Sequence, residues 1–272
     1  MRYLAHHGIK GQKWGVRRYQ NEDGSLTPEG KIRYGAGPNT YGPVEDTVLK
    51  SGTKLRSVSS RYFSGNDYKN SGNPLYTYNA ENDWDNKVYK GPFSMYLVAY
   101  RGASFVKEFE FKTVSDLKMP TKEERVGEFK NLYSDKKYSR DMIRVMRSTQ
   151  QQLKSYNIGS KESQNVNIKN LKSDEDFNAA YEVFNHAMEA QHRYKSTSEY
   201  FKRMSNKYDA MVDDNNQGIY NMTNDPIIVF RTDKLIAENA GIPIKDLTWA
   251  EIQENTEHVR DELKKHGQNV KL

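Results

Sequence analysis

The chain has 272 residues, and its 42 Lys and Arg outnumber 36 Asp and Glu to give a net charge of +6. It contains no cysteine, which excludes disulfides, thiolate nucleophiles and cysteine-based zinc sites. No apolar run approaches the roughly 18 residues of a membrane-spanning helix, so we expect no membrane contact. Acidic and basic residues are interspersed, which is more typical of a solvated surface than of a dedicated nucleic-acid binder.

Residues 1–43 form a basic, glycine-rich arm that ends in Gly-Pro pairs, and these breakers predict a boundary. Glycine weakens both helices and strands, so the arm is not an ordinary core element. We interpret it as a docking peptide that adds little to core stability. Tryptophan and arginine dominate interface energetics, so we expect Trp14, Arg17 and Arg18 to lead any docking. Nucleic acid is a less favoured partner of the same basic residues.

The arm contains HGIKGQKWGVRRYQN at residues 7–21 and NEDGSLTPEGKIRYG at residues 21–35. Together these segments resemble a motif found at the ends of many phage and prophage proteins of Gram-positive bacteria. The resemblance implies a phage-encoded protein. A host bacterial protein or a virion component is then the expected partner, and the host cytoplasm or the virion the expected location.

The segment 44–119 is typical of short strands with one helical turn. The run Met95–Tyr100 is continuously apolar and predicts a buried strand, while Phe105–Thr113 alternates and predicts a strand with one buried face. The remaining elements that we expect here are strands within Leu49–Ser59 and Pro74–Asn79 and a helical turn at Asp83–Tyr89.

Helical signals begin with a capping box at Thr121–Glu124. We expect a first helix with Val126, Phe129 and Tyr133 on one face and a second with Met142, Met146 and Leu153. A polar loop at 157–172, a long helix at 173–206, two short strands at Tyr208–Val212 and Pro226–Phe230, and a closing helix after Thr248 complete the expected elements. We therefore predict one α+β domain over residues 44–272, in which a mixed or antiparallel sheet of short strands packs with several helices.

The sequence offers little for a metal. None of the six histidines has metal-ligand spacing. Asp213–Gly218 has the spacing that begins a calcium loop, but position 12 of such a loop falls on Asn224, where a bidentate glutamate is needed. We interpret this run as a polar turn and expect no metal.

Over roughly residues 45–235, the order of the strand-like segments resembles ADP-ribosyltransferase-like domains, including those of polyvalent phage proteins thought to be injected with the genome. The segments that carry the resemblance are Lys54–Arg56, Leu75–Tyr78, Tyr208–Val212 and Pro226–Phe230.

The resemblance implies NAD as cofactor. Arg56 would bind its pyrophosphate through the planar guanidinium. Tyr76 and Tyr78 would stack on the nicotinamide. Asp209 or Asp213 would hold a ribose hydroxyl and stabilise the positive charge that develops as nicotinamide leaves.

The sequence departs from that family at two points. Lys207 stands where the family has glycine before the late strand pair, and no glutamate occupies the expected catalytic strand. Two functions therefore remain open. One is an ADP-ribosyltransferase or NAD glycohydrolase that acts on a host target. The other is a non-catalytic virion-associated or anti-defence protein that sequesters a host partner, in which case Arg56, Tyr76 and Tyr78 are ordinary strand and packing residues.

Overall fold

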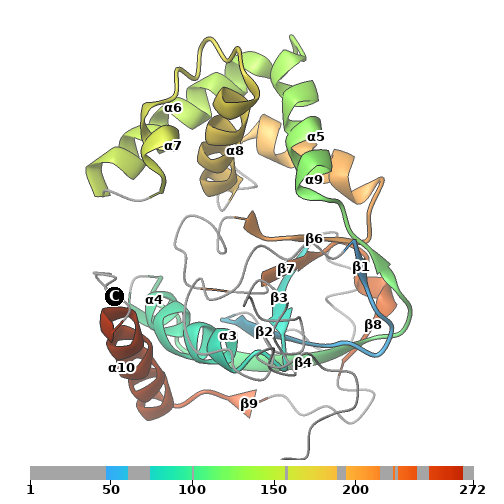
Figure 1. Cartoon of the computed structure of the whole chain (residues 1–272). Coiled ribbons are helices and arrows are strands. Elements are labelled where there is room, and N and C mark those ends of the chain that lie inside the picture. Colours follow the sequence, from blue (N-terminus) through green and yellow to red (C-terminus); the bar gives the residue numbers. More distant parts are fainter. Residues whose placement is uncertain are drawn as a thin grey trace, which may run out of the picture.

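A curled antiparallel sheet organises the chain, and two groups of helices pack on it (Figure 1). The structure is a computed structural model, and it describes residues 47–60, 74–99, 101–156, 159–188, 194–214, 223, 226–237 and 245–265. The fold is α+β, as the sequence predicts. The basic arm at 1–43 lies outside the described residues.

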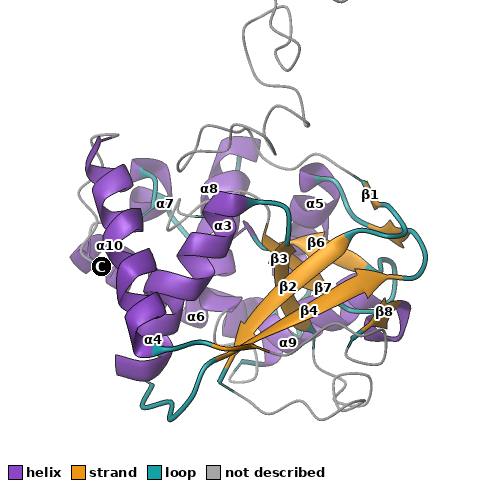
Figure 2. Ribbon diagram, turned by 90° about the horizontal axis from the view of Figure 1, so that it is seen from below, coloured by secondary structure: helices purple, strands orange, loops and turns teal. Residues whose placement is uncertain are grey.

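The sheet has the order β6-β7-β3-β2-β4-β8, with β9 added beside β4, and its pairs are antiparallel. Figure 2 shows β2 and β4 lying side by side. A separate two-stranded sheet joins β1 to β5. The strands are β1 (Val48–Leu49), β2 (Lys54–Ser59), β3 (Leu75–Asn79), β4 (Lys107–Thr113), β5 (Leu117–Lys118), β6 (Ala210–Val212), β7 (Pro226–Val229), β8 (Leu235–Ile236) and β9 (Lys245–Asp246).

The two faces of the sheet differ because neighbouring strand residues point to opposite sides. One face buries an apolar cluster that includes Leu55, Leu75, Phe109, Phe111, Ala210, Val212, Ile227 and Val229. The other face is covered by helices. Ile228 and Met211 join one helical group there, and Val58 and Tyr78 join the other.

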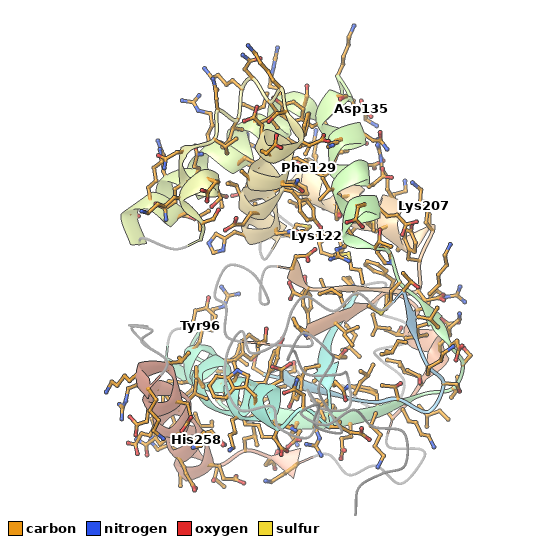
Figure 3. All side chains as sticks on the ribbon, in the orientation of Figure 1. Tyr96, Lys122, Phe129, Asp135, Lys207 and His258 are labelled. Carbon is orange, nitrogen blue, oxygen red and sulfur yellow. The ribbon has the colours of Figure 1, made fainter. Side chains whose placement is uncertain are left out.

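The first helical group comes from the middle of the chain, between β5 and β6. It contains α5 (Lys122–Ser134), α6 (Ser139–Tyr156), α7 (Lys161–Asn165), α8 (Asp174–Met188) and α9 (Lys195–Ser205). The expected capping box is present, since Thr121 Oγ1 accepts from the Glu124 N–H and a Glu124 carboxylate oxygen accepts from the Thr121 N–H. Phe129 is fully buried at the centre of this layer (Figure 3).

The second helical group packs α3 (Asp83–Val88), η1 (Tyr89–Phe93) and α4 (Ser94–Ala99) against α10 (Trp249–Lys265). Val259 and Leu263 of α10 are buried with Trp84 and Val88 of α3. Gly91 permits the close approach, because a Cβ there would lie 2.7 Å from the backbone between Asn255 and Thr256. A short 3-10 helix, η3 (Thr232–Lys234), links β7 to β8.

Three expectations are wrong in the described part of the chain. The apolar run at 95–100 is not a strand, because α4 continues the helical chain of α3 and η1 through residue 99, and an apolar run alone does not distinguish the two states. The expected loop at 157–172 contains α7, whose N-cap is Ser160. The expected helix at 173–206 is two helices, α8 and α9. The second begins where the Asp141 carboxylate accepts from the N–H and Oγ of Ser196.

Candidate functional site

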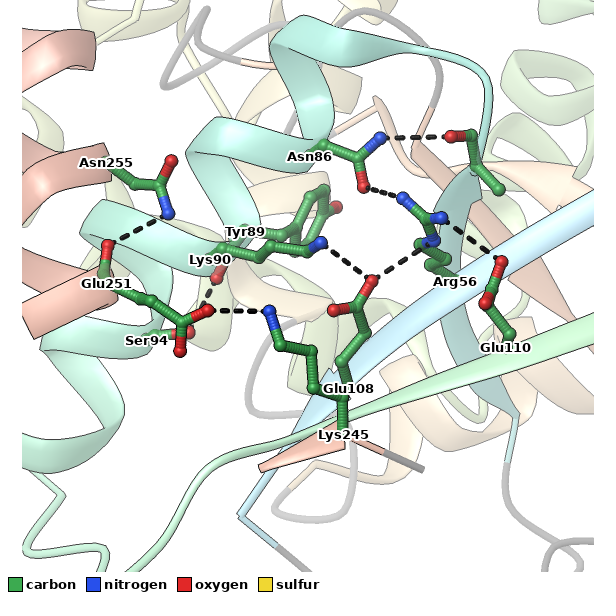
Figure 4. A network of polar contacts seen from close by, with 11 residues as sticks. Arg56, Asn86, Tyr89, Lys90, Ser94, Glu108, Glu110, Lys245, Glu251 and Asn255 are labelled. Atoms are coloured by element: carbon green, nitrogen blue, oxygen red, sulfur yellow. Dashed lines mark hydrogen bonds and ion pairs between the residues drawn. The ribbon is translucent and has the colours of Figure 1, made fainter. Parts of the chain in front are cut away.

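Arg56 is the centre of a polar cluster on the helix-covered face of the sheet (Figure 4). Its Nη1 donates to Asn86 Oδ1 of α3 over 2.7 Å, and its Nη2 donates to Glu110 Oε1 of β4 over 3.1 Å. Its Nε lies 3.1 Å from Glu108 Oε1, which is ion-pair distance without the geometry of a hydrogen bond. Each of the three guanidinium nitrogens therefore faces an oxygen of the protein itself.

Glu108 is held between two cations. Its Oε1 lies 3.1 Å from Arg56 Nε and 2.8 Å from Lys90 Nζ, and its side chain is only 7% exposed. A buried carboxylate is costly without such partners. Asn86 fixes the other side of Arg56 because its Nδ2 donates to the Ala80 carbonyl over 2.9 Å. The cluster thus ties β2 and β4 to the helices that cover them.

Tyr78 lies directly opposite Arg56 in the pair of β2 and β3, so both side chains are on the same face. The ring of Tyr78 is fully buried and stacks on Tyr89, with centroids 4.3 Å apart and planes at 7°. Its hydroxyl has no hydrogen-bond partner among the described residues. Burial, and then the charge of Glu108, raise the pKa of Tyr78 well above its usual value. The Tyr78 phenol is therefore uncharged, and its side chain belongs to the core and is not exposed to solvent.

Tyr76 is on the same face two residues earlier, opposite Ile228 of β7. It is half-buried and packs against the α5–α9 layer, whereas Tyr78 belongs to the cluster beneath η1 and α10. The two tyrosines that sequence analysis assigns to nicotinamide thus enter different parts of the core.

Asp209 lies just before β6 and is paired locally. Its Oδ2 accepts from the Lys118 N–H over 2.9 Å and from Lys234 Nζ over 2.8 Å. Burial acts to raise the pKa of Asp209, but these two hydrogen bonds outweigh it, and the pKa is lowered. Asp209 is therefore an ionised carboxylate that already has two donors.

Asp213 extends the ladder of β6, because its N–H donates to the Pro226 carbonyl over 2.9 Å. Pro226 lies opposite Tyr78, and Tyr78 lies opposite Arg56, so Asp213 stands in the same cross-strand row. Three strand spacings separate the two ends of the row, or about 14 Å between backbones. The structure therefore brings Arg56 and Tyr78 together and places the two aspartates elsewhere along the sheet.

Glu108 and Glu110 are the acidic residues that sequence analysis did not assign to this site. Their alternation with Phe109 and Phe111 puts them on the polar face of β4. The missing information is the strand order, because only the pairing of β2 with β4 places both glutamates beside Arg56. Glu110 and Arg56 are 28% and 24% exposed, so the edge of the cluster reaches solvent.

A second polar cluster joins the α5–α9 layer to the end of β6. Arg125 is 1% exposed, and its Nε and Nη2 donate to the Asp214 carboxylate over 2.6 and 2.8 Å. Tyr181 donates to the same carboxylate over 2.9 Å, and the Tyr200 hydroxyl donates to the Arg125 carbonyl over 3.1 Å. The sequence alone does not predict this cluster, because its members lie on three helices and on the segment after β6, which are distant from one another in the chain.

Neither a metal centre nor a membrane helix is found in the part of the chain that the structure describes. There, no group of three His, Asp or Glu side chains is arranged to hold a metal ion. No described helix combines the length and the apolar character that crossing a bilayer requires.

The candidate docking residues Trp14, Arg17 and Arg18 lie outside the described residues. Residues 1–21 match a family model described as a family of unknown function (DUF7211). No curated protein and no solved structure matches the chain.

Proposed function

We propose that the chain is a phage-encoded accessory protein that acts by binding a partner and does not consume NAD. The observation that carries this proposal is the internal use of Arg56, whose three nitrogens face Asn86, Glu108 and Glu110. Arginine binds a pyrophosphate through the same planar fork of donors. A bound pyrophosphate would have to displace the interactions of the Arg56 guanidinium with Glu108 and Glu110. Among the described residues, Glu108 would then keep only Lys90 as a cationic partner.

The buried state of Tyr78 supports the same proposal. Stacking on a nicotinamide requires an open ring face, and the ring is fully buried against Tyr89. Asp209, the other carboxylate expected to hold the ribose, already accepts hydrogen bonds from the Lys118 N–H and from Lys234 Nζ.

The N-terminal motif is the docking element of this proposal. Its partner would be a host bacterial protein or a virion component, met in the host cytoplasm or in the packaged virion. The test compares the full chain with a Trp14→Ala, Arg17→Ala, Arg18→Ala variant in co-sedimentation with purified virions and in capture from host lysate. A Lys31→Ala, Arg33→Ala variant is the matched control, because it removes two cations from the same arm.

We expect the triple variant to lose the partners that both other proteins retain, since tryptophan and arginine carry most interface energy. If all three proteins retain the same partners, or if none binds any, the docking role of this motif is rejected.

An ADP-ribosyltransferase-like activity is the second candidate, and one observation favours it. Arg56 and Tyr78 are cross-strand partners on one face, and the partly exposed carboxylate of Glu110 lies beside them. That places an arginine, a tyrosine and a glutamate together, although the glutamate is on β4. The test is nicotinamide release from NAD with and without host lysate. If the protein acts only by binding, we expect no nicotinamide release above a buffer control. Nicotinamide release that Glu110→Gln abolishes would establish the enzyme instead.

A further inference from the structure

One face of α6 is a continuous basic stripe. Arg140, Arg144, Arg147, Gln151 and Lys154 follow one another at intervals of three or four residues and are all exposed. At about 100° per residue these five positions fall within an arc of about 80°, and Arg140 to Lys154 spans about 21 Å of helix. Lys136 precedes Arg140 by four residues and is also exposed.

The opposite face of α6 is already used. Met142, Met146 and Leu153 are fully buried in the core of the helical layer. The stripe therefore points away from the protein, on the side of α6 opposite its buried apolar residues.

Most cations of the stripe have no internal partner. The side chains of Lys136, Arg140, Arg147 and Lys154 make no ion pair or hydrogen bond within the described structure. Arg144 differs, since its Nη2 donates to Asp141 Oδ1 over 2.6 Å. Elsewhere on the protein, the cations Arg56, Arg125 and Arg203 are each matched to carboxylates.

The segment that contains the stripe carries nearly as much net positive charge as the whole chain. Residues 136–154 hold six Lys and Arg and a single acid, Asp141, whereas the net charge of all 272 residues is +6. A set of unpaired cations on a rigid helix is the arrangement by which proteins neutralise a row of phosphates and release their counterions.

We infer that the exposed face of α6 binds the phosphate backbone of a nucleic acid. The inference goes beyond the proposed function, because it adds a second class of partner at a surface separate from the N-terminal motif. Three of the five positions are arginines, which grip phosphate bidentately. A membrane surface fits less well, because interfacial helices bury an apolar face in the lipid and the apolar face of α6 is in the core.

The experiment is a fluorescence-anisotropy titration of a labelled DNA duplex of mixed sequence with the full chain, repeated between about 50 and 200 mM salt. The test variant is Arg140→Gln, Arg147→Gln, at two exposed and unpaired positions. The control is Arg260→Gln, Lys264→Gln on α10, which makes the same change in net charge at exposed positions in the other helical group (Figure 1).

We expect log K to fall with log salt at a slope of about −4, since four or five cations would each contribute about −0.9. The test variant should bind several-fold more weakly and reduce the slope by about 2, while the control keeps the wild-type slope. Equal weakening by both variants would overturn the inference, because the net charge alone would then account for binding.

Two further arms separate the alternatives. Vesicles that contain phosphatidylserine test a lipid surface, and binding to them that depends on Arg140 and Arg147 and exceeds binding to DNA would also overturn the inference. Nicotinamide release is measured on the same sample. If the protein neither binds DNA nor releases nicotinamide, this inference is rejected and the proposed function stands. If the protein binds DNA and also releases nicotinamide, this inference stands and the proposed function is rejected.

Discussion

Arg56 and Tyr78 are cross-strand partners on one face of the sheet, yet neither presents its functional group as an open site. The Arg56 guanidinium faces Asn86 and two glutamates, and Tyr78 is stacked beneath η1. The residues are arranged as a structural cluster that joins the sheet to α3, η1 and α10.

Removing the guanidinium of Arg56 should destabilise the fold. Arg56→Met leaves Glu108 buried with Lys90 as its remaining cation. We expect a loss of about 2–3 kcal/mol, below the roughly 3–5 kcal/mol for a buried pair left with no partner. The measurement is urea unfolding at neutral pH, and Glu110→Gln is the control. Because Glu110 is at the edge, that variant should cost less than about 1 kcal/mol. Equal costs would show that the cluster is not buried.

The Arg125–Asp214 pair should be the more sensitive polar contact. Asp214→Asn removes the charge that Arg125 meets in a buried environment and weakens a bidentate pair. We expect a loss of about 3–5 kcal/mol in chemical unfolding. Tyr181→Phe removes one hydrogen bond to the same carboxylate and should cost about 1 kcal/mol. A larger effect of Tyr181→Phe than of Asp214→Asn would contradict this ranking.

Two helical glycines should respond oppositely to alanine. At Gly91 a Cβ would lie 2.7 Å from the backbone of α10, so Gly91→Ala should separate the helices and cost about 1–3 kcal/mol. At Gly127 a Cβ would meet nothing within 4 Å, so Gly127→Ala should gain about 0.5–1 kcal/mol. Thermal unfolding of both variants is the measurement. A neutral Gly91→Ala would mean that α10 does not pack on η1 as described.

Glu251 makes the start of α10 sensitive to acid. The Lys245 ammonium and the Thr248 N–H lower the pKa of Glu251 to about 2. A carboxyl whose folded pKa lies below its usual 4.5 stabilises the fold above pH 4.5, and the contribution is lost as pH falls toward about 2. The difference in unfolding free energy between the wild type and Glu251→Gln should therefore shrink between about pH 6 and about pH 3. A difference that does not change with pH would reject this assignment.

Local sequence signals predicted several of the local elements correctly. The alternation around Phe109 and Phe111 correctly predicted β4, and the capping box at Thr121–Glu124 correctly predicted the start of α5. The closing helix after Thr248 was also expected, and α10 begins at Trp249. These features depend on neighbours within one turn or one strand.

Features that depend on distant parts of the chain could not be predicted in this way. The pairing of β2 with β4 that brings Glu108 to Arg56 joins residues about fifty positions apart. The partnership of Arg125 with Asp214 depends on where the helical layer sits. The basic stripe of α6 was available from the spacing of Arg140, Arg144 and Arg147, but the sequence does not tell which of those cations are paired.

The central claim is that Arg56 serves the fold and does not bind NAD, and a thermal shift tests it most directly. The melting temperatures of the wild type and of Arg56→Lys are measured against NAD up to millimolar concentrations, each relative to its own value without NAD. We predict no shift for either protein. A ligand at about 100 times its Kd would stabilise the native state by about 2.7 kcal/mol. A rise in the wild-type melting temperature that grows with NAD concentration and is lost in Arg56→Lys would contradict the claim.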